Sequence, residues 1–276
     1  YYTPAGSSDP DFSTTAQSTY IIAYNPNGSA ITVNHQTRQG GVIVNGNFSV
    51  PAGGHFNFRM PQGSGGRFWT PGGETFYALS AIDFNSTASD WGFPLVQSGQ
   101  LTTSVVVGLG WGQVNPAPAP AENSSPVWVT AVADTDLYVD FDSDPNTGTL
   151  LDANGDLYDQ LIAINQLESL QIRDTADGDQ SQMKLYTLDN TLITAAWGQD
   201  PATASPADPA LDMGTFIIPF PDIDVVKVGV LVNDLNGDGG IDPGDTIQYS
   251  IDVSNKGVSA NQGVIIATGG FEWDEE

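Results

Sequence analysis

The chain consists of short stretches in which apolar and polar residues alternate, and no long stretch repeats apolar residues at helical spacing. The alternating stretches are rich in Val, Ile, Thr, Tyr and Phe, and they are bounded by Asn, Gly, Pro and Asp, which favour turns. This pattern predicts an all-β protein of tandem antiparallel β-sandwiches, Ig-like or jelly-roll-like, with a partial sandwich module at the C-terminal end.

The first predicted domain, residues 1–116, is one β-sandwich preceded by a polar arm. Residues 19–24 and 30–35 are expected to pair as a hairpin over a turn at 25–28. Residues 101–107 are expected to close this sandwich. The strands predicted between them are residues 42–44, 48–50, 55–58 and 76–82.

The second predicted domain, residues 123–220, follows a Pro-Ala segment at 115–122 that is typical of an extended linker. The alternative for this segment is a long surface loop within one domain. Residues 127–132 and 135–141 are expected to form a hairpin over Ala133 and Asp134. The later strands of this domain are predicted at residues 161–164, 170–173, 184–188, 192–197 and 214–220.

The last predicted domain, residues 223–276, has too few strands to close a sandwich. Its strands are predicted at residues 225–232, 246–253 and 263–268, which is about half of what a sandwich needs. The remaining strands therefore come either from the preceding domain or from another chain.

The net charge of −26 is unevenly distributed along the chain, and its distribution bears on which partners the protein can bind. Of the 33 acidic residues, 28 lie after residue 120, and 27 of the 33 are Asp. A strong Asp bias in D-x-D and D-x-N-G-D patterns indicates turns and metal ligation rather than a merely soluble surface. Nucleic acid is excluded as a partner, because such a field repels phosphate and the seven basic residues are scattered.

The composition also bears on where the protein works. The chain has no cysteine, which excludes disulfides and thiolate metal sites, and no apolar run long enough to span a bilayer, so no transmembrane segment is expected. It starts without a basic and apolar leader, so a signal peptide is expected to have been removed or not numbered. We expect an extracellular or cell-surface location, since calcium sites of this density need millimolar calcium.

The clearest candidate site is the twelve-residue loop at 234–245, between two predicted strands. Oxygen-bearing side chains stand at loop positions 1, 3, 5, 9 and 12, and a glycine stands at position 6, as in calcium-binding loops. The predicted Ca²⁺ ligands are Asp234, Asn236, Asp238, the carbonyl of Gly240, Asp242 and Asp245.

Two further groups of acids are candidate calcium ligands at less regular spacing. The first group follows a predicted strand and comprises Asp140, Asp142, Asp144, Asn146, Asp152, Asn154 and Asp156, with Asp159 beside it. The second comprises Asp174, Asp177 and Asp179. The alternative for both groups is a series of Asx-turns, in which a carboxylate accepts hydrogen bonds from the backbone that follows it.

A family resemblance is carried by residues 234–257, DLNGDGGIDPGDTIQYSIDVSNKG. This segment resembles the opening half of the conserved-repeat β-sandwich domain of bacterial and archaeal surface proteins, and its loop resembles that of dockerins, with Asp245 at the last position. The stretches SPVWVTAV, LYVDFDSD and AAWGQDPATASP resemble segments that precede such repeats. The resemblance implies secretion, calcium-dependent sandwiches, a structural or adhesive role and no enzyme activity.

Motifs for catalysis are missing from the sequence. No G-x-S-x-G, H-E-x-x-H, P-loop or Rossmann spacing occurs, and His35 and His55 are isolated, so we do not expect an enzyme. Paired carboxylates of a glycoside hydrolase remain an alternative that only the fold can test. A binding face for a glycan could use Trp69, Trp91 or Trp111, which lie beside glycines, although core packing is the alternative for each. Trp128 and Trp197 are expected in the core.

These observations together predict a secreted, calcium-stabilised structural or adhesive surface protein. We expect it to assemble with copies of itself into an extracellular filament or layer by strand addition. The alternative is a carbohydrate- or matrix-binding module of a larger surface protein.

Overall fold

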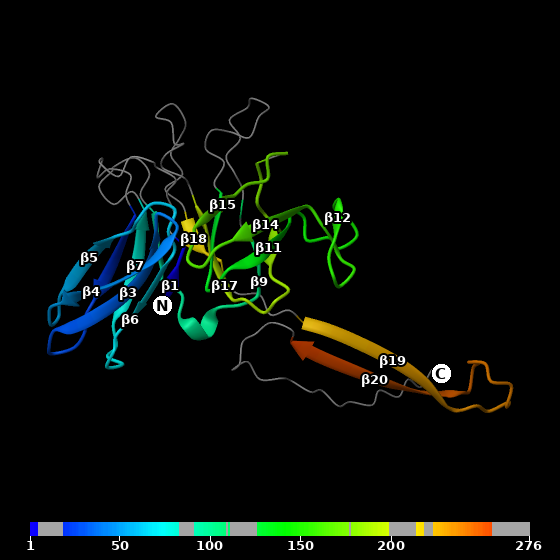
Figure 1. Ribbon diagram of the computed structural model, residues 1–276. Coiled ribbons are helices and arrows are strands. Elements are labelled where there is room, and N and C mark those ends of the chain that lie inside the picture. Colours follow the sequence, from blue (N-terminus) through cyan, green and yellow to red (C-terminus); the bar gives the residue numbers. More distant parts are fainter. Residues whose placement is uncertain are drawn as a thin grey trace. The chain divides into compact units, whose positions relative to one another are not determined.

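The structure is a computed structural model that describes residues 1–4, 19–82, 91–108, 110, 126–176, 178–198, 214–217 and 223–255 (Figure 1). Within these ranges the regular structure is β-strand, with one short 3₁₀ turn at Ser98–Gln100, so the predicted all-β class is confirmed. No helix in these ranges is long and apolar enough to cross a membrane. The chain divides into two compact units, residues 1–220 and 221–276, which are described separately.

The first part of unit 1 is a β-sandwich of two four-stranded antiparallel sheets. One sheet has the order β1 (Tyr2–Thr3), β6 (Gly66–Trp69), β3 (Ile31–Gln39), β4 (Val42–Val50). The other has the order β5 (His55–Arg59), β2 (Tyr20–Tyr24), β7 (Tyr77–Ile82), β8 (Trp91–Pro94).

The core of this sandwich follows from the alternation of side chains along the strands. In β3 the buried positions are Ile31, Val33, His35 and Thr37, because successive side chains point to opposite faces of a sheet. The other buried apolar residues of this core are Ile21, Ala23, Phe48, Val50, Met60, Phe68, Phe76 and Leu95.

A second sandwich of two four-stranded sheets completes unit 1. One sheet has the order β15 (Leu170–Ile172), β10 (Val127–Ala131), β17 (Ile193–Gly198), β18 (Gly214–Phe216). The other has the order β14 (Gln160–Ile164), β11 (Thr135–Asp140), β16 (Lys184–Tyr186), β9 (Ser104–Val106). A two-stranded extension of β12 (Leu150–Leu151) and β13 (Leu157–Tyr158) lies in the connection between β11 and β14.

The two sandwiches share an aromatic junction. Every residue of β10 and β17 is buried, which requires both faces of these strands to be covered. One face packs into the core of the second sandwich, and the other carries Trp128 and Ala196, which join Trp91, Phe93 and Phe216 in a separate buried cluster. Since Trp91 and Phe93 belong to β8 of the first sandwich, this cluster, here called the aromatic junction, joins the two sandwiches.

Three predictions about the partners of strands are wrong. Residues 19–24 and 30–35 do not pair as a hairpin, because β2 and β3 lie in different sheets of the first sandwich. The same holds for β10 and β11 in the second sandwich. In both cases the two strands pack against one core from opposite sheets, so the short connection carries the chain across the sandwich. Residues 101–107 do not close the first sandwich, because β9 pairs with β16 instead.

Unit 2 contains a long antiparallel ribbon of β19 (Ile223–Asn233) and β20 (Thr246–Asn255). The two strands pair in register from Ile223 with Asn255 to Leu231 with Ile247, and a bulge follows between Leu231 and Asn233. The predicted arm, residues 1–17, is described only at residues 1–4, where β1 is an edge strand. The rest of the arm, the predicted strand at 263–268, the Pro-Ala segment at 115–122, Trp111 and Asp177 lie outside the described residues.

Candidate metal sites

The loop between β19 and β20 holds its carboxylates in place through backbone N–H groups. Oδ1 of Asp234 accepts a hydrogen bond from the N–H of Gly237 (2.6 Å), and Oδ2 accepts one from the N–H of Gly239 (2.7 Å). Gly237 and Gly239 have φ of 75° and 79°, a region in which glycine is not strained. The sharp turn around Asp234 therefore depends on glycines at these two positions.

Side chains from the middle of the loop meet at Asn236. Its amide Nδ2 donates to Oδ2 of Asp238 (3.2 Å) and to Oδ2 of Asp242 (2.9 Å). The N–H of Gly240 donates to Oδ1 of Asp238 (2.7 Å). Two of the predicted ligand side chains, Asp238 and Asp242, thus lie within hydrogen-bond distance of a third, Asn236.

Asp245 closes the loop at the start of β20. Its Oδ1 accepts from the N–H of Leu235 (2.9 Å), and its Oδ2 accepts from the N–H of Asp242 (2.8 Å). The last predicted ligand is thereby tied to both ends of the loop. The two N–H bonds from Gly239 and Gly237 hold the pKa of Asp234 below its usual value, so this carboxylate stays ionised at neutral pH.

The acids that follow β11 form a series of Asx-turns. Oδ1 of Asp140 accepts from the N–H of Ser143 (2.9 Å), and Oδ1 of Asp142 accepts from the N–H of Asp144 (3.0 Å). Oδ1 of Asp144 accepts from both the N–H (2.9 Å) and the Nδ2 (2.8 Å) of Asn146. These bonds are the ones expected of the alternative interpretation, in which local backbone donors satisfy the carboxylates.

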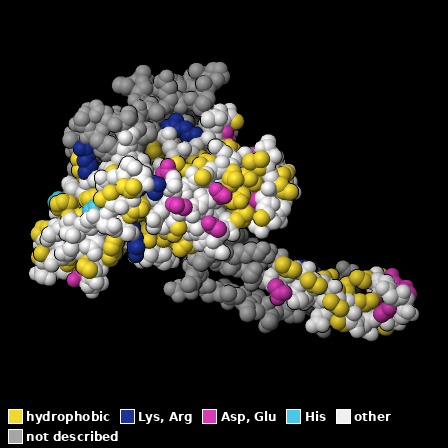
Figure 2. Space-filling model, in the orientation of Figure 1, with side chains coloured by type: hydrophobic (Ala, Val, Ile, Leu, Met, Phe, Trp, Pro, Cys, Tyr) yellow, Lys and Arg dark blue, Asp and Glu magenta, His cyan; other side chains and the backbone are white. Residues whose placement is uncertain are grey.

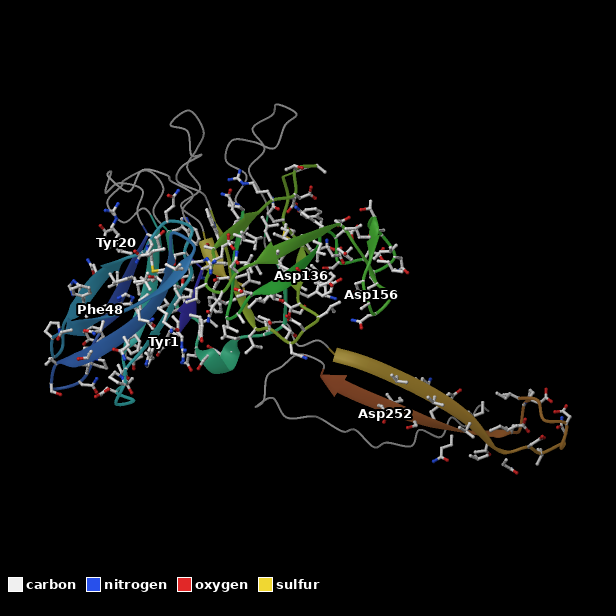
Figure 3. The ribbon with its side chains drawn as sticks, in the orientation of Figure 1. Tyr1, Tyr20, Phe48, Asp136, Asp156 and Asp252 are labelled. Atoms are coloured by element: carbon white, nitrogen blue, oxygen red, sulfur yellow. The ribbon has the colours of Figure 1, made fainter. Side chains whose placement is uncertain are left out.

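Asp152, in the turn between β12 and β13, is buried and fully engaged by protein donors. Its Oδ1 accepts from the N–H groups of Asn154 (2.8 Å) and Asp156 (3.0 Å), and its Oδ2 accepts from the hydroxyl of Tyr186 (3.0 Å). Burial, followed by the bond to Asp152, raises the pKa of Tyr186. Figure 3 labels Asp156 in this turn. Asp159 likewise accepts from the N–H of Phe141 (2.8 Å).

Asp140 has the most perturbed carboxyl group of this region. Burial raises its pKa from 3.8 to about 6, and the neighbouring carboxylate of Asp142 adds to this rise. The pKa of Asp142 itself is lowered, chiefly by the N–H of Asp144 and the hydroxyl of Thr147. The pKa values of these two neighbouring carboxyl groups are therefore shifted in opposite directions, since Asp140 is buried whereas Asp142 is exposed and well supplied with donors.

The third acidic group is organised around a buried glutamine. Gln180 is fully buried, accepts from the N–H of Asp174 at Oε1 (2.6 Å) and donates from Nε2 to the carbonyl of Gly178 (3.0 Å). Asp174 accepts from the N–H of Ala176 (2.7 Å), and Asp179 accepts from the N–H of Ser181 (2.8 Å). The carboxylates of Asp174 and Asp179 thus serve local turns.

Across the described residues, no three side chains of His, Cys, Asp or Glu converge closely enough to form a metal-binding group. At Asn236 the amide nitrogen Nδ2 faces the carboxylates of Asp238 and Asp242, and Oδ1 accepts from the N–H of Asp238; the amide oxygen is the atom of Asn236 that would ligate calcium. The donor set of the 234–245 loop consists of carboxylate, amide and backbone oxygens, which fits a hard cation such as Ca²⁺ and does not fit zinc. A carboxylate also has about four lone-pair positions, so one N–H bond per oxygen leaves positions for an ion.

The described tryptophan and histidine candidates differ in burial. Trp91 lies in the aromatic junction and Trp197 in the core of the second sandwich, whereas Trp69 is half-buried with the Arg67 guanidinium 4.8 Å from its ring. His35 is buried against Phe58, with ring centroids 4.3 Å apart, and burial lowers its pKa. His55 begins β5 and is exposed.

Sequence reasoning missed three residues that shape these loops. Thr147 donates to Asp142, Tyr186 donates to Asp152, and Gln180 holds the loop at 174–180 together. Thr147 follows Asp142 by five residues, so a turn between them would have been a usable signal. No local pattern points to Tyr186 or Gln180, because their partners depend on the fold.

Comparisons with known proteins found no matching family model, no matching curated protein and no matching solved structure.

Proposed function

We propose that this chain is a secreted structural or adhesive surface protein whose last module is stabilised by Ca²⁺. The observation that carries the proposal is the loop at 234–245, in which Asn236, Asp238 and Asp242 meet and Asp245 is bound back to Leu235. The resemblance of residues 234–257 to conserved-repeat domains of surface proteins supports the same conclusion, as does the concentration of Asp in turns. No catalytic activity is part of the proposal.

Calcium would act on stability through the charge of the loop. Four carboxylates within twelve residues repel one another, and an ion coordinated by them converts this repulsion into attraction. Because Asp234 follows β19 and Asp245 precedes β20, an ion held by both fixes the start of the ribbon. Binding free energy then becomes folding free energy of unit 2.

The location follows from the affinity expected of such a site. Exposed calcium loops in extracellular modules have dissociation constants as weak as about 10⁻⁴–10⁻³ M, which match millimolar calcium outside cells. The loop is exposed, and its carboxylates are bound to backbone N–H groups rather than to a buried framework. We therefore propose a weak to moderate site that is filled outside the cell.

The test is hydrogen exchange of the ribbon amides and thermal unfolding in 2 mM CaCl₂, 2 mM MgCl₂ and EDTA. With a dissociation constant of about 10⁻⁴ M, 2 mM calcium adds about 1.8 kcal/mol to the stability of unit 2, and with one of about 10⁻³ M it adds about 0.6 kcal/mol. Asp238→Ala should abolish this gain. Asp252→Ala, which removes an acid from β20 outside the loop, should retain it. Equal protection of residues 226–252 in calcium and in EDTA would exclude the calcium role.

The assembly we propose is a homo-oligomer formed by strand addition, which builds an extracellular filament or layer. It is supported by a final module that shows two strands among the described residues, fewer than an independent sandwich needs. Electron microscopy of the protein with and without calcium tests it. Particles of one chain under both conditions, at concentrations above about 0.1 mM, would contradict the filament.

A second candidate function, glycan binding, is favoured by one exposed aromatic pair. Tyr24 and Tyr77 are cross-strand neighbours on β2 and β7, with 43% and 59% of their surfaces exposed and ring centroids 6.5 Å apart. Exposed aromatic rings can stack on the apolar face of a sugar. Binding on a glycan array that is lost in Tyr24→Ala and kept in Tyr24→Phe would support this function.

A further inference from the structure

The outer edge of β20 is a candidate pairing surface of the ribbon. β20 runs for ten residues and pairs with β19 on one side, and no other described strand pairs with it. Its backbone N–H and C=O groups on the other side form a row that is suited to a further strand. Figure 2 shows the hydrophobic side chains along the ribbon and the acidic side chains of its loop.

The two outer edges of the ribbon differ in how they are protected against pairing with a further strand. β19 carries Lys227 and a bulge between Leu231 and Asn233, two features that natural proteins use to block edge pairing. From Thr246 to Asp252, β20 has no Lys, Pro, Gly or bulge. The unprotected edge is therefore that of β20.

The side chains of β20 also need a neighbour. Tyr249 and Ile251 are 53% and 50% exposed and lie on the same face as Lys227 and Gly229. The Tyr249 ring covers Gly229, and the Lys227 ammonium lies 4.1 Å from the ring centroid. Among the described residues no further strand covers the outer side of Tyr249 and Ile251, and two-stranded ribbons alone are marginally stable in water.

We propose that β20 pairs antiparallel with β20 of a second copy of this chain, about a two-fold axis at Ser250. This register places Ser250 opposite Ser250, Tyr249 opposite Ile251, and Gln248 opposite Asp252 of the other copy. An aromatic ring then meets a β-branched side chain, a favourable cross-strand pair, and no like charges are opposite one another. The result is a four-stranded sheet whose outer edges are the two protected β19 strands.

Electrostatic repulsion between the acidic loops favours the antiparallel orientation of the two β20 strands. The acidic loop at 234–245 precedes β20 in each copy, so antiparallel pairing places the two loops at opposite ends of the sheet. Parallel pairing would bring eight carboxylates together, and a chain of net charge −26 would oppose that. The pairing rests on the proposed function only in that both involve strand addition.

The test uses two variants of the full chain that add the same charge to the same strand. Ser250→Lys places two ammonium groups opposite each other at the axis, and we expect the dimer dissociation constant to rise at least tenfold. Gln248→Lys places an ammonium group opposite Asp252 of the other copy, and we expect the dissociation constant to fall several-fold, less so at high salt. Sedimentation equilibrium in 2 mM CaCl₂ measures both.

A cross-linking experiment tests the register directly, because the chain has no cysteine of its own. Ser250→Cys should form a disulfide-linked dimer under mild oxidation, since residues at the axis are within disulfide distance. Val228→Cys is the matched control, because Val228 pairs with Ser250 in the same row but lies on β19. We expect no cross-link from it.

The outcomes separate this inference from the proposed function. Three results would overturn the pairing, even if calcium stabilises the ribbon. They are a monomer in calcium at a chain concentration of 0.5 mM, a Ser250→Cys variant that does not cross-link, and equal changes of the dimer dissociation constant in Ser250→Lys and Gln248→Lys. A cross-linked dimer that never forms filaments would support the pairing and contradict the filament. Protection of the outer β20 amides in a monomer would show that another part of the same chain occupies the edge.

Discussion

The aromatic junction makes a sharp prediction about stability, centred on Gly214 at the start of β18. A methyl group at Gly214 would lie 1.7 Å from Cε3 of Trp91, and one at Gly198 would lie 2.5 Å from the same ring. Ordinary contacts between carbon atoms begin at about 3.5 Å, so the indole must retreat by roughly 2 Å. Trp91 is buried against Phe93, with ring centroids 5.6 Å apart, and has little room to move.

Gly214→Ala should therefore destabilise unit 1 by about 2–3 kcal/mol, the usual cost of overpacking a core. With a urea dependence of about 3 kcal/mol per molar for a unit of this size, the midpoint should fall by roughly 1 M. Gly28→Ala is the matched control, because a methyl group there meets no atom within 4 Å, and its midpoint should change little. Both variants are measured by urea denaturation in calcium.

A double-mutant cycle with Trp91→Leu identifies the cause. The smaller side chain leaves space for the new methyl group, so Gly214→Ala should cost at least about 1 kcal/mol less in the Trp91→Leu background than alone. Additive effects of the two substitutions would show that Gly214 acts through its own backbone. A Gly214→Ala variant within about 0.5 kcal/mol of the native chain would refute the close packing of β18 on Trp91.

Three polar sites in unit 1 give further predictions, each measured by urea denaturation. Asp140→Asn in EDTA should raise the free energy of unfolding by about 1–2 kcal/mol at pH 8 and change it little below pH 4. Burial raises the pKa of Asp140 from 3.8 to about 6, so the native carboxyl group destabilises the fold only at a pH where it is ionised. The contribution of His35 to stability should become unfavourable as the pH falls below 6.5, since burial lowers the pKa of His35 and the unfolded chain takes up the proton first; the stability of His35→Leu relative to the native chain should therefore rise as the pH falls. Tyr186→Phe should cost about 1–3 kcal/mol by removing the hydroxyl from buried Asp152, whereas exposed Tyr77→Phe should cost less than about 0.5 kcal/mol.

The positions of strands could be predicted from sequence better than their partners. Alternation locates β3, β11 and β20, because a strand that covers a core has one apolar face whatever sheet it joins. The pairing of β10 with β11 could not be predicted correctly from the short turn between them. Val129 and Leu137 are both fully buried in one core but reach it from opposite sheets, and a short turn is compatible with either arrangement.

In the loops that carry candidate metal ligands, and around the tryptophans, only local contacts could be predicted from the sequence. The spacing of Asp234, Asn236 and Asp238 predicts a turn that gathers oxygen atoms, since the bonds within it are local. Trp91 could not be assigned from its neighbours: a tryptophan beside a glycine suggests an exposed ring, yet the glycines that make room for it are Gly198 and Gly214, more than a hundred residues away. Contacts between distant segments leave no local pattern in the sequence.

The calcium binding and the strand pairing proposed for unit 2 would be thermodynamically linked. An ion held between Asp234 and Asp245 would fix the loop end of the ribbon, and a second copy would fix the outer edge of β20. Each event would supply part of the ordering that the other requires, so each should strengthen the other by the same factor. The ion would also reduce the charge of a loop that adjoins the end of the other copy's strand. On these two proposals, the ribbon would form a joint between copies where calcium and neighbouring copies are both present.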